Sequence, residues 1–119
     1  MMAPELLGAP VYEVKADLFK ALAHPVRVRA LEVLAEGREH SVGDLAAEIG
    51  IESAHLSQQL SILRRAGLVV SRREATTVYY SLKDPLLVEL LAVARKLLIS
   101  GLEATRELLE GLEAQNTRR

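Results

Sequence analysis

Apolar side chains recur along this chain at the three- to four-residue spacing of α-helices over most of its length. The spacing predicts one helix from Val11 to Leu22 and a second from Pro25 to Gly37, where the fixed φ of proline suits a first helical turn. The polar stretch from Gly37 to His40 is expected to be a turn. The chain therefore begins, after a short tail, with two helices.

Two further helices follow, joined by a tight turn. Ser41 stands three residues before Asp44, in the manner of a capping box, and Gly50 suits the end of this short helix. Ser53 is the predicted N-cap of the next helix, which extends over residues 53–66. Its buried stripe is expected to comprise Leu56, Leu60 and Leu63. This is the arrangement of a helix-turn-helix, whose second helix enters the major groove of DNA.

Strand-like residues come directly after that helix. Segments 68–73 and 78–82 are rich in Val, Tyr and Ser and are separated by residues 74–77, which predicts a β-hairpin. We call this hairpin, residues 68–82, the wing. The fold class predicted is mainly α with a small β-hairpin (α+β), a winged helix-turn-helix with about five helices that dimerises through its terminal helices.

The last predicted helix carries more apolar side chains than one buried face needs. Asp84 and Pro85 are expected to form its N-cap and first residue, and its apolar pattern continues to Leu112. Eleven of the fourteen residues from Leu86 to Ile99 are apolar, so a second copy of the chain is the expected partner. The predicted dimer interface comprises Leu18, Leu87, Leu90, Leu91, Ala94, Leu98 and Leu102.

Composition narrows the class of protein. The 119 residues suit one domain, 1–119, with flexible tails predicted at 1–10 and 114–119. The absence of cysteine excludes disulfides, thiolate metal sites and thiol redox sensing. No secretory signal and no apolar run of membrane-spanning length is visible, so no membrane partner and a cytoplasmic location are expected.

Charge is unevenly distributed. The chain carries a formal net charge of −1, yet residues 53–83 hold five Lys or Arg and one acid, Glu74. This basic third coincides with the second helix of the helix-turn-helix and the wing, as expected of a surface that contacts phosphates. The side chains expected to read bases are Ser53, His55, Ser57, Gln58 and Gln59, and those expected to hold phosphates are Ser41, Arg64, Arg65, Arg72, Arg73 and Thr77.

Three stretches resemble a known family: LFKALAHPVRVRALEVL (Leu18–Leu34), SVGDLAAEIGIESAHLSQQLSILRRAGLVVSRRE (Ser41–Glu74) and VYYSL (Val78–Leu82). They are similar to the ArsR/SmtB family of bacterial winged helix-turn-helix repressors. The resemblance implies a homodimeric transcription factor that binds a palindromic DNA operator, often represses its own operon, and releases DNA when an effector binds.

The chain departs from that family at its usual effector ligands. The metal sensors of that family commonly use Cys ligands, or His on the last helix. This chain has no Cys, and residues 85–119 contain no His, so we predict no metal ligands, and no cofactor is evident. His24 is expected to pack or cap, His40 to be exposed, and His55 to face DNA. A nickel or zinc effector held by these histidines together with Asp or Glu, or with the N-terminal tail, stays open. In the wing, Ala75 stands where the family has a turn glycine and Thr76 where it has an arginine, so a weaker wing contribution is expected.

The sequence favours two other functions less. An enzyme is not expected, because no phosphate-binding loop, carboxylate pair or Ser/His/Asp pattern is recognisable. A protein-interaction module built on the last helix is the alternative, and a regulatory protein partner could also deliver the signal to a DNA-binding dimer. The basic segment favours DNA.

Overall fold

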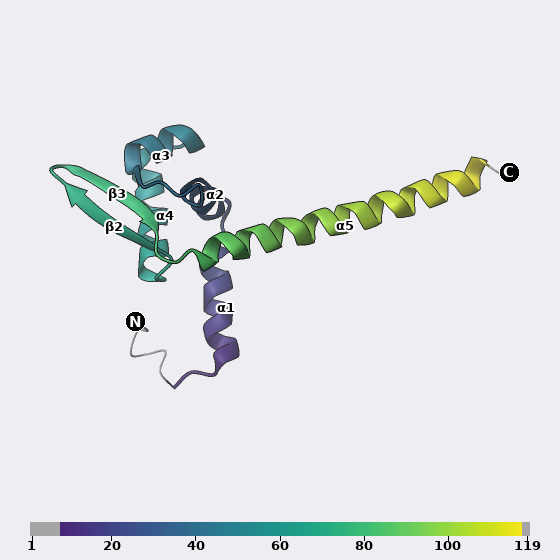
Figure 1. Cartoon of the computed structure of the whole chain (residues 1–119), viewed down its shortest axis with the longest axis horizontal. Coiled ribbons are helices and arrows are strands. Elements are labelled where there is room, and N and C mark those ends of the chain that lie inside the picture. The colour runs from purple at the N-terminus through teal and green to yellow at the C-terminus, as the bar shows by residue number, and fades with distance from the viewer. Residues whose placement is uncertain (1–7, 118–119) are drawn as a thin grey trace. The chain divides into compact units, whose positions relative to one another are not determined.

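The computed structural model describes residues 8–117, with side chains to residue 115 (Figure 1). Its elements are α1 (Val11–Leu22), α2 (Pro25–Leu34), β1 (His40–Ser41), α3 (Val42–Ile49), α4 (Ser53–Arg65), β2 (Val69–Glu74), β3 (Thr77–Leu82) and α5 (Leu86–Thr117). They divide into two compact units, one ending at Pro85 and one starting at Leu86. The predicted mainly α fold with five helices and a hairpin is confirmed for the described residues.

Helices α2, α3 and α4 enclose the core of the first unit. Leu31 of α2 and Leu45 of α3 are fully buried, and so is the predicted stripe of α4, namely Leu56, Leu60 and Leu63. Burying one such leucine stabilises the fold by about 1.5–3 kcal/mol relative to leaving it in water. Because these leucines occupy one side of α4, its other side is turned toward solvent.

The local signals of the helix-turn-helix are partly confirmed. The Ser41 hydroxyl accepts a hydrogen bond from the Asp44 backbone N–H at 3.1 Å, as the capping pattern predicts. Gly50 ends α3 at φ +86°, a conformation that costs glycine little. The N-cap of α4 is Glu52, without a side-chain cap bond, so the prediction of Ser53 was wrong by one residue. Ser53 is the first residue of the helix instead.

A small antiparallel sheet follows, in the order β1–β3–β2. β2 and β3 form the predicted wing, with Ser71 opposite Tyr80 and Arg73 opposite Val78. β1 lies where the sequence predicted part of a turn, and pairs His40 with Tyr80. Two residues are too few for alternation to show in a sequence, and the strand exists because β3 offers it a partner.

Helix α2 is shorter than predicted. It ends at Leu34, whereas the sequence predicted a helix that continues to Gly37.

Helix α5 forms the second unit. It begins at Leu86, so the prediction that Pro85 is its first residue was wrong by one position. It continues through Thr117, beyond the predicted apolar pattern and into the predicted tail, while residues 1–7 and 118–119 of the two predicted tails lie outside the described residues. No helix among the described residues is long and apolar enough to cross a membrane.

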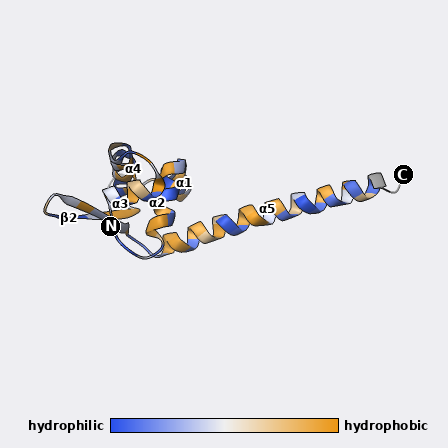
Figure 2. Cartoon of the chain, turned by 90° about the horizontal axis from the view of Figure 1, so that it is seen from above, coloured by the Kyte–Doolittle hydropathy of each residue, from blue (hydrophilic) through white to orange (hydrophobic). Residues whose placement is uncertain are grey.

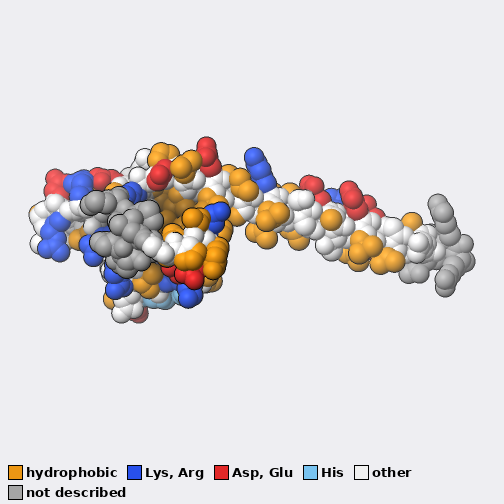
Figure 3. All heavy atoms as spheres, turned by 90° about the horizontal axis from the view of Figure 1, so that it is seen from below, with side chains coloured by type: hydrophobic (Ala, Val, Ile, Leu, Met, Phe, Trp, Pro, Cys, Tyr) orange, Lys and Arg blue, Asp and Glu red, His pale blue; other side chains and the backbone are white. Residues whose placement is uncertain are grey.

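Much of the apolar surface of α5 is exposed. Figure 2 shows a largely apolar first half, and Figure 3 shows hydrophobic side chains gathered along one side of the helix. Leu97, Leu98 and Leu102 expose 70–73% of their surface. A single chain therefore leaves a long apolar stripe in contact with water.

Candidate nucleic-acid interface

The solvent-facing side of α4 carries the predicted base-reading residues. Ser53, His55 and Gln58 are exposed, and Ser57 and Gln59 are half-buried. Serine and glutamine side chains both donate and accept hydrogen bonds, which is what recognition of base edges requires. The structure thus places the predicted set on one helix, with Gln58 the more accessible of its two glutamines.

Gln59 has a partner that sequence reasoning missed. Arg27 of α2 donates from Nη1 to Gln59 Oε1 at 3.2 Å and from Nη2 to the Lys20 carbonyl oxygen of α1 at 3.4 Å. Its Nε is buried and has no hydrogen-bond partner among the described residues. Arg27 therefore links α1 and α4. Because its Nη1 donates to Gln59 Oε1, the amide oxygen of Gln59 faces α2 and its NH2 group faces away.

The histidines occupy two separate places. His24 caps α2, because its Nδ1 accepts a hydrogen bond from the Val26 backbone N–H at 3.2 Å, which confirms the predicted capping role. His55 of α4 lies beside it, with the ring centroids 6.4 Å apart. His40 was expected to be exposed, but only 10% of its side chain is, because β1 places it next to Glu48. That prediction was wrong.

The described residues do not gather a metal-binding group. No cluster of three or more His, Asp or Glu side chains lies close enough to hold an ion within this part of the chain. His24 and His55 would supply two ligands, and Nδ1 of His24 is already engaged by the backbone. The arrangement in one chain does not fit a nickel or zinc site.

The two adjacent arginines of β2 face opposite ways, as alternation along a strand requires. Arg72 donates from Nε to Glu39 at 2.9–3.0 Å, pairs with that carboxylate again through Nη2, and donates from Nη1 to Glu74 at 3.0 Å. Its guanidinium also lies 4.5 Å from the ring centroid of Tyr79. Its charge is thus balanced by two carboxylates in the free protein.

This ion pair shifts the protonation of its partners. The hydrogen bond from Arg72 holds the pKa of the Glu39 carboxyl below its usual range. Glu39 and Glu74 raise the pKa of Arg72 further above its ordinary value. Both groups are therefore charged at neutral pH, and Arg72 would have to exchange Glu39 for a phosphate in order to bind DNA as the sequence predicts.

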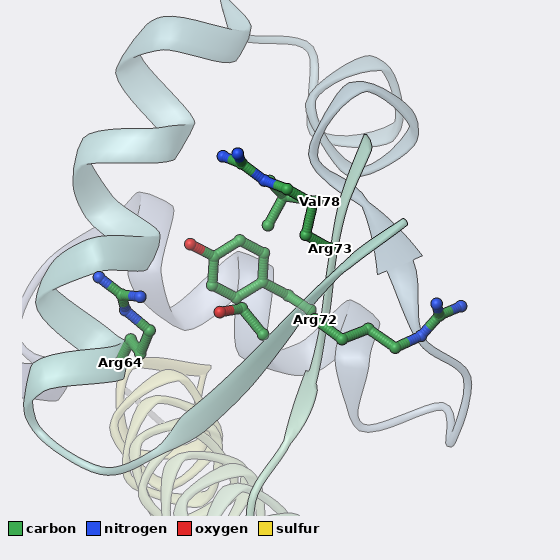
Figure 4. Close-up of a pocket in the computed structure, with 6 residues that line it drawn as sticks. Arg64, Arg72, Arg73 and Val78 are labelled. Carbon is green, nitrogen blue, oxygen red and sulfur yellow. The ribbon is translucent and has the colours of Figure 1, made fainter. Parts of the chain in front are cut away.

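Arg73 points to the other side of the wing, into the space between the wing and α4. Figure 4 shows Arg64 and Arg73 extending into the space between α4 and the wing, with Arg72 directed away from it. The cavity there has a volume of about 330 Å³ and is lined by Arg64, Ser71, Arg72, Arg73, Val78 and Tyr80. No acidic side chain lines it, so the lining carries net positive charge.

The other predicted phosphate contacts lie around these elements. Ser41 caps α3 through its hydroxyl, Arg65 is exposed and donates to the Ser61 carbonyl oxygen at 3.3 Å, and Thr77 is half-buried at the start of β3. Strand alternation in the sequence was the signal that could have separated Arg72 from Arg73. No sequence signal identifies Glu39, whose contact spans 33 residues.

The predicted dimer residues differ in exposure. Ala94, Leu98 and Leu102 of α5 are exposed, Leu90 and Leu91 are half-buried, and Leu87 is buried. Leu18 of α1 is half-buried, beside an exposed Phe19. The exposed members are available to a partner, and the assignment of the whole set to a dimer interface stays a prediction.

Comparison with known proteins identifies the family. The sequence profile of "Bacterial regulatory protein, arsR family" matches residues 24–71, from the cap of α2 into β2. An HTH-type transcriptional regulator of Mycobacterium tuberculosis, Rv0081, is 51% identical over 106 residues, covering 88% of this chain and 92% of the relative. The "Biofilm growth-associated repressor" of Agrobacterium fabrum is 49% identical over 69 residues, 58% of each protein.

Solved structures agree with the sequence comparison. The crystal structure of Rv0081 superimposes with a TM-score of 0.73 at 50% identity, covering 82% of this chain and 98% of that one. The homodimeric winged helix-turn-helix DNA-binding domain Mb0332 of Mycobacterium bovis gives a TM-score of 0.71 at 29% identity, covering 87% and 93%. By sequence and by structure, this chain belongs to the ArsR family of bacterial regulatory proteins, which are transcriptional regulators with a winged helix-turn-helix.

Proposed function

We propose that this protein is a homodimeric repressor that binds a palindromic DNA operator, with α4 in the major groove and the wing at the backbone or minor groove. The observation that carries the proposal is the solvent-facing side of α4, where Ser53, His55 and Gln58 are exposed immediately before a basic hairpin. Hydrogen-bonding side chains on the second helix of a helix-turn-helix read base edges. Its operator DNA would place it in the bacterial cytoplasm.

The stripe on α5 supports the homodimer. Leu98, Leu102 and Leu109 expose 54–70% of their surface, and exposed apolar stripes of this length are covered in stable proteins. On α1, Tyr12 and Phe19 are exposed in the same way. The related Mb0332 domain is a homodimer. A two-fold dimer would set its two α4 helices about 34–36 Å apart, one turn of DNA, which calls for an operator with two inverted half-sites.

Repression is supported by relatives. Relatives from Agrobacterium fabrum, Xylella fastidiosa and Synechocystis are named repressors, and the family profile describes bacterial regulatory proteins. A bound dimer blocks transcription when its operator overlaps a promoter.

The test is fluorescence anisotropy of the full chain on DNA from its own upstream region, against scrambled DNA, across a salt series. A preference of about 10³-fold or more is expected of a specific regulator. Gln58→Ala should lose about 1–3 kcal/mol on the operator and relax preference at one base pair per half-site, without a matching loss on scrambled DNA. Equal weak binding to both DNAs by the wild type would reject the proposal and favour a protein-interaction module.

Repeating the titration with nickel or zinc tests a metal effector directly.

The control for Gln58→Ala is Arg29→Gln, which removes a charge from an exposed i,i+3 ion pair with Glu32 on α2, outside the predicted interface. It is expected to bind like the wild type, because exposed ion pairs contribute little. A loss as large as that of Gln58→Ala would show that a substitution outside the predicted interface lowers the affinity equally, and the loss at Gln58 could then not be assigned to base reading.

A further inference from the structure

The cavity between α4 and the wing has the composition of an oxyanion site. It is lined by Arg64 from α4 and by Arg73 and Ser71 from β2, and Tyr80 of β3 contributes a second hydroxyl-bearing side chain. Guanidinium groups bind phosphate through two parallel N–H donors, and hydroxyls add further donors. The lining contains no Asp or Glu that would compete for an anion.

The register of the wing explains why these groups converge. Ser71 pairs with Tyr80 and Arg73 pairs with Val78, so these four residues occupy one face of the hairpin. Arg72 and Tyr79 pair on the opposite face, where Glu39 and Glu74 engage Arg72. Of the two adjacent arginines, only Arg73 therefore has its guanidinium directed into the cavity (Figure 4).

The geometry of DNA indicates which oxyanion reaches this place. On one face of a duplex, the major groove and the neighbouring minor groove are separated by a single sugar-phosphate strand. If α4 enters the major groove and the wing reaches the next minor groove, that strand must pass between α4 and the wing. The cavity lies at that position, between the same two elements.

We propose that Arg64 and Arg73 clamp one phosphate of the DNA strand that passes between α4 and the wing, with Ser71 and Tyr80 lining the same oxyanion site. This inference rests on the proposed function and adds a division of labour to it: Arg73 grips the backbone, whereas Arg72 stays paired with Glu39. Free phosphate has the same chemistry and would occupy the site when DNA is absent.

The first arm of the test compares Arg64→Gln, Arg73→Gln and Arg72→Gln on operator DNA across a salt series. Arg64→Gln and Arg73→Gln should each bind about 10- to 100-fold more weakly at low salt, and each should reduce the salt slope by about one. Arg72→Gln, which makes the same charge change at the neighbouring position, should lose roughly threefold or less. Equal losses for Arg72→Gln and Arg73→Gln would overturn the division of labour.

The second arm locates the phosphate. Operator duplexes carrying a single neutral methylphosphonate at successive backbone positions are titrated with the wild type and with Arg73→Gln. One position in each half-site should weaken wild-type binding but leave Arg73→Gln unaffected, because the contact is already lost. If the two losses add at every position, Arg73 does not hold a particular phosphate and the inference is wrong.

The third arm separates the two sources of the anion and does not depend on DNA binding. Inorganic phosphate is titrated into the protein at constant ionic strength, and the guanidinium Nε–Hε signals of Arg64 and Arg73 are followed by NMR against chloride. Shifts in these two signals, absent for Arg72, support an oxyanion site even for a protein that ignores the operator. No shift here and no position-specific effect with DNA would refute the site.

Discussion

Removing either partner of the contact between Arg27 and Gln59 should change the free energy of unfolding by different amounts. Arg27 makes two long hydrogen bonds, one of 3.2 Å at the upper end of the usual range and one of 3.4 Å beyond it. Together they contribute about 1–2 kcal/mol. Its buried Nε, which has no partner among the described residues, costs about 1–3 kcal/mol. Arg27→Met removes all three groups while keeping an apolar stem, so the free energy of unfolding should change by less than about 1 kcal/mol.

Gln59→Ala acts differently because it leaves the arginine in place. The guanidinium then loses the acceptor for Nη1 and keeps its desolvated Nε, so the fold should lose about 1–2 kcal/mol. In the Arg27→Met background the same substitution should cost less than about 0.5 kcal/mol. The matched control is Gln58→Ala, the same truncation at an exposed neighbour on α4, which should stay within about 0.5 kcal/mol of the wild type.

Urea unfolding followed by circular dichroism measures all four variants at one protein concentration, since dissociation of a dimer would otherwise enter the result. The reasoning fails if Arg27→Met loses more than about 2 kcal/mol, because the two hydrogen bonds would then outweigh the unpaired Nε. It also fails if the effects of Arg27→Met and Gln59→Ala add within about 0.3 kcal/mol, since residues in contact must couple.

Three further predictions concern the wing and α5. Ala75 lies in the wing turn at φ +55°, so Ala75→Gly should relieve about 1–2 kcal/mol of backbone strain and lose about 0.5–1 kcal/mol to chain entropy. The free energy of unfolding measured in urea should therefore rise, and a decrease would contradict this. Arg72→Gln should raise the pKa of Glu39 toward its ordinary range, because it removes the hydrogen bond from Arg72 that lowers this pKa. In the wild type the lowered pKa stabilises the folded state above the ordinary pKa of Glu, and this stabilisation is lost as pH falls through the lowered value. An NMR titration that finds an unchanged Glu39 pKa would refute the pairing. Leu98→Glu should raise the dissociation constant of the dimer by at least about 100-fold, because it replaces an exposed apolar side chain of α5 with a charged one. Sedimentation experiments measure this constant, with Ser100→Glu on the same helix as the control. An intact Leu98→Glu dimer would exclude Leu98 from the interface.

Local patterns in the sequence were sufficient to predict most of the helices and the hairpin. The three- to four-residue recurrence of leucines identified α4 and its buried side, because a helix that packs on a core must repeat its apolar positions with the helical period. The Ser41 cap and Gly50 were recognisable because their conformations are decided by neighbouring backbone atoms. The change to Val- and Tyr-rich alternation located the wing. The side of α4 available for DNA followed from its buried side alone.

Contacts between distant segments were decided only by the tertiary structure. β1 exists because β3 pairs with it, and it leaves only 10% of the His40 side chain exposed, whereas the sequence predicted an exposed histidine. Strand alternation places Arg72 and Arg73 on opposite faces of the wing, but it does not say what each face meets. Glu39, 33 residues before Arg72, neutralises Arg72, and the end of α4 places Arg64 beside the cavity that Arg73 enters. The Arg27–Gln59 contact spans 32 residues. Such pairings depend on how whole elements dock, and no short-range period or cap encodes them.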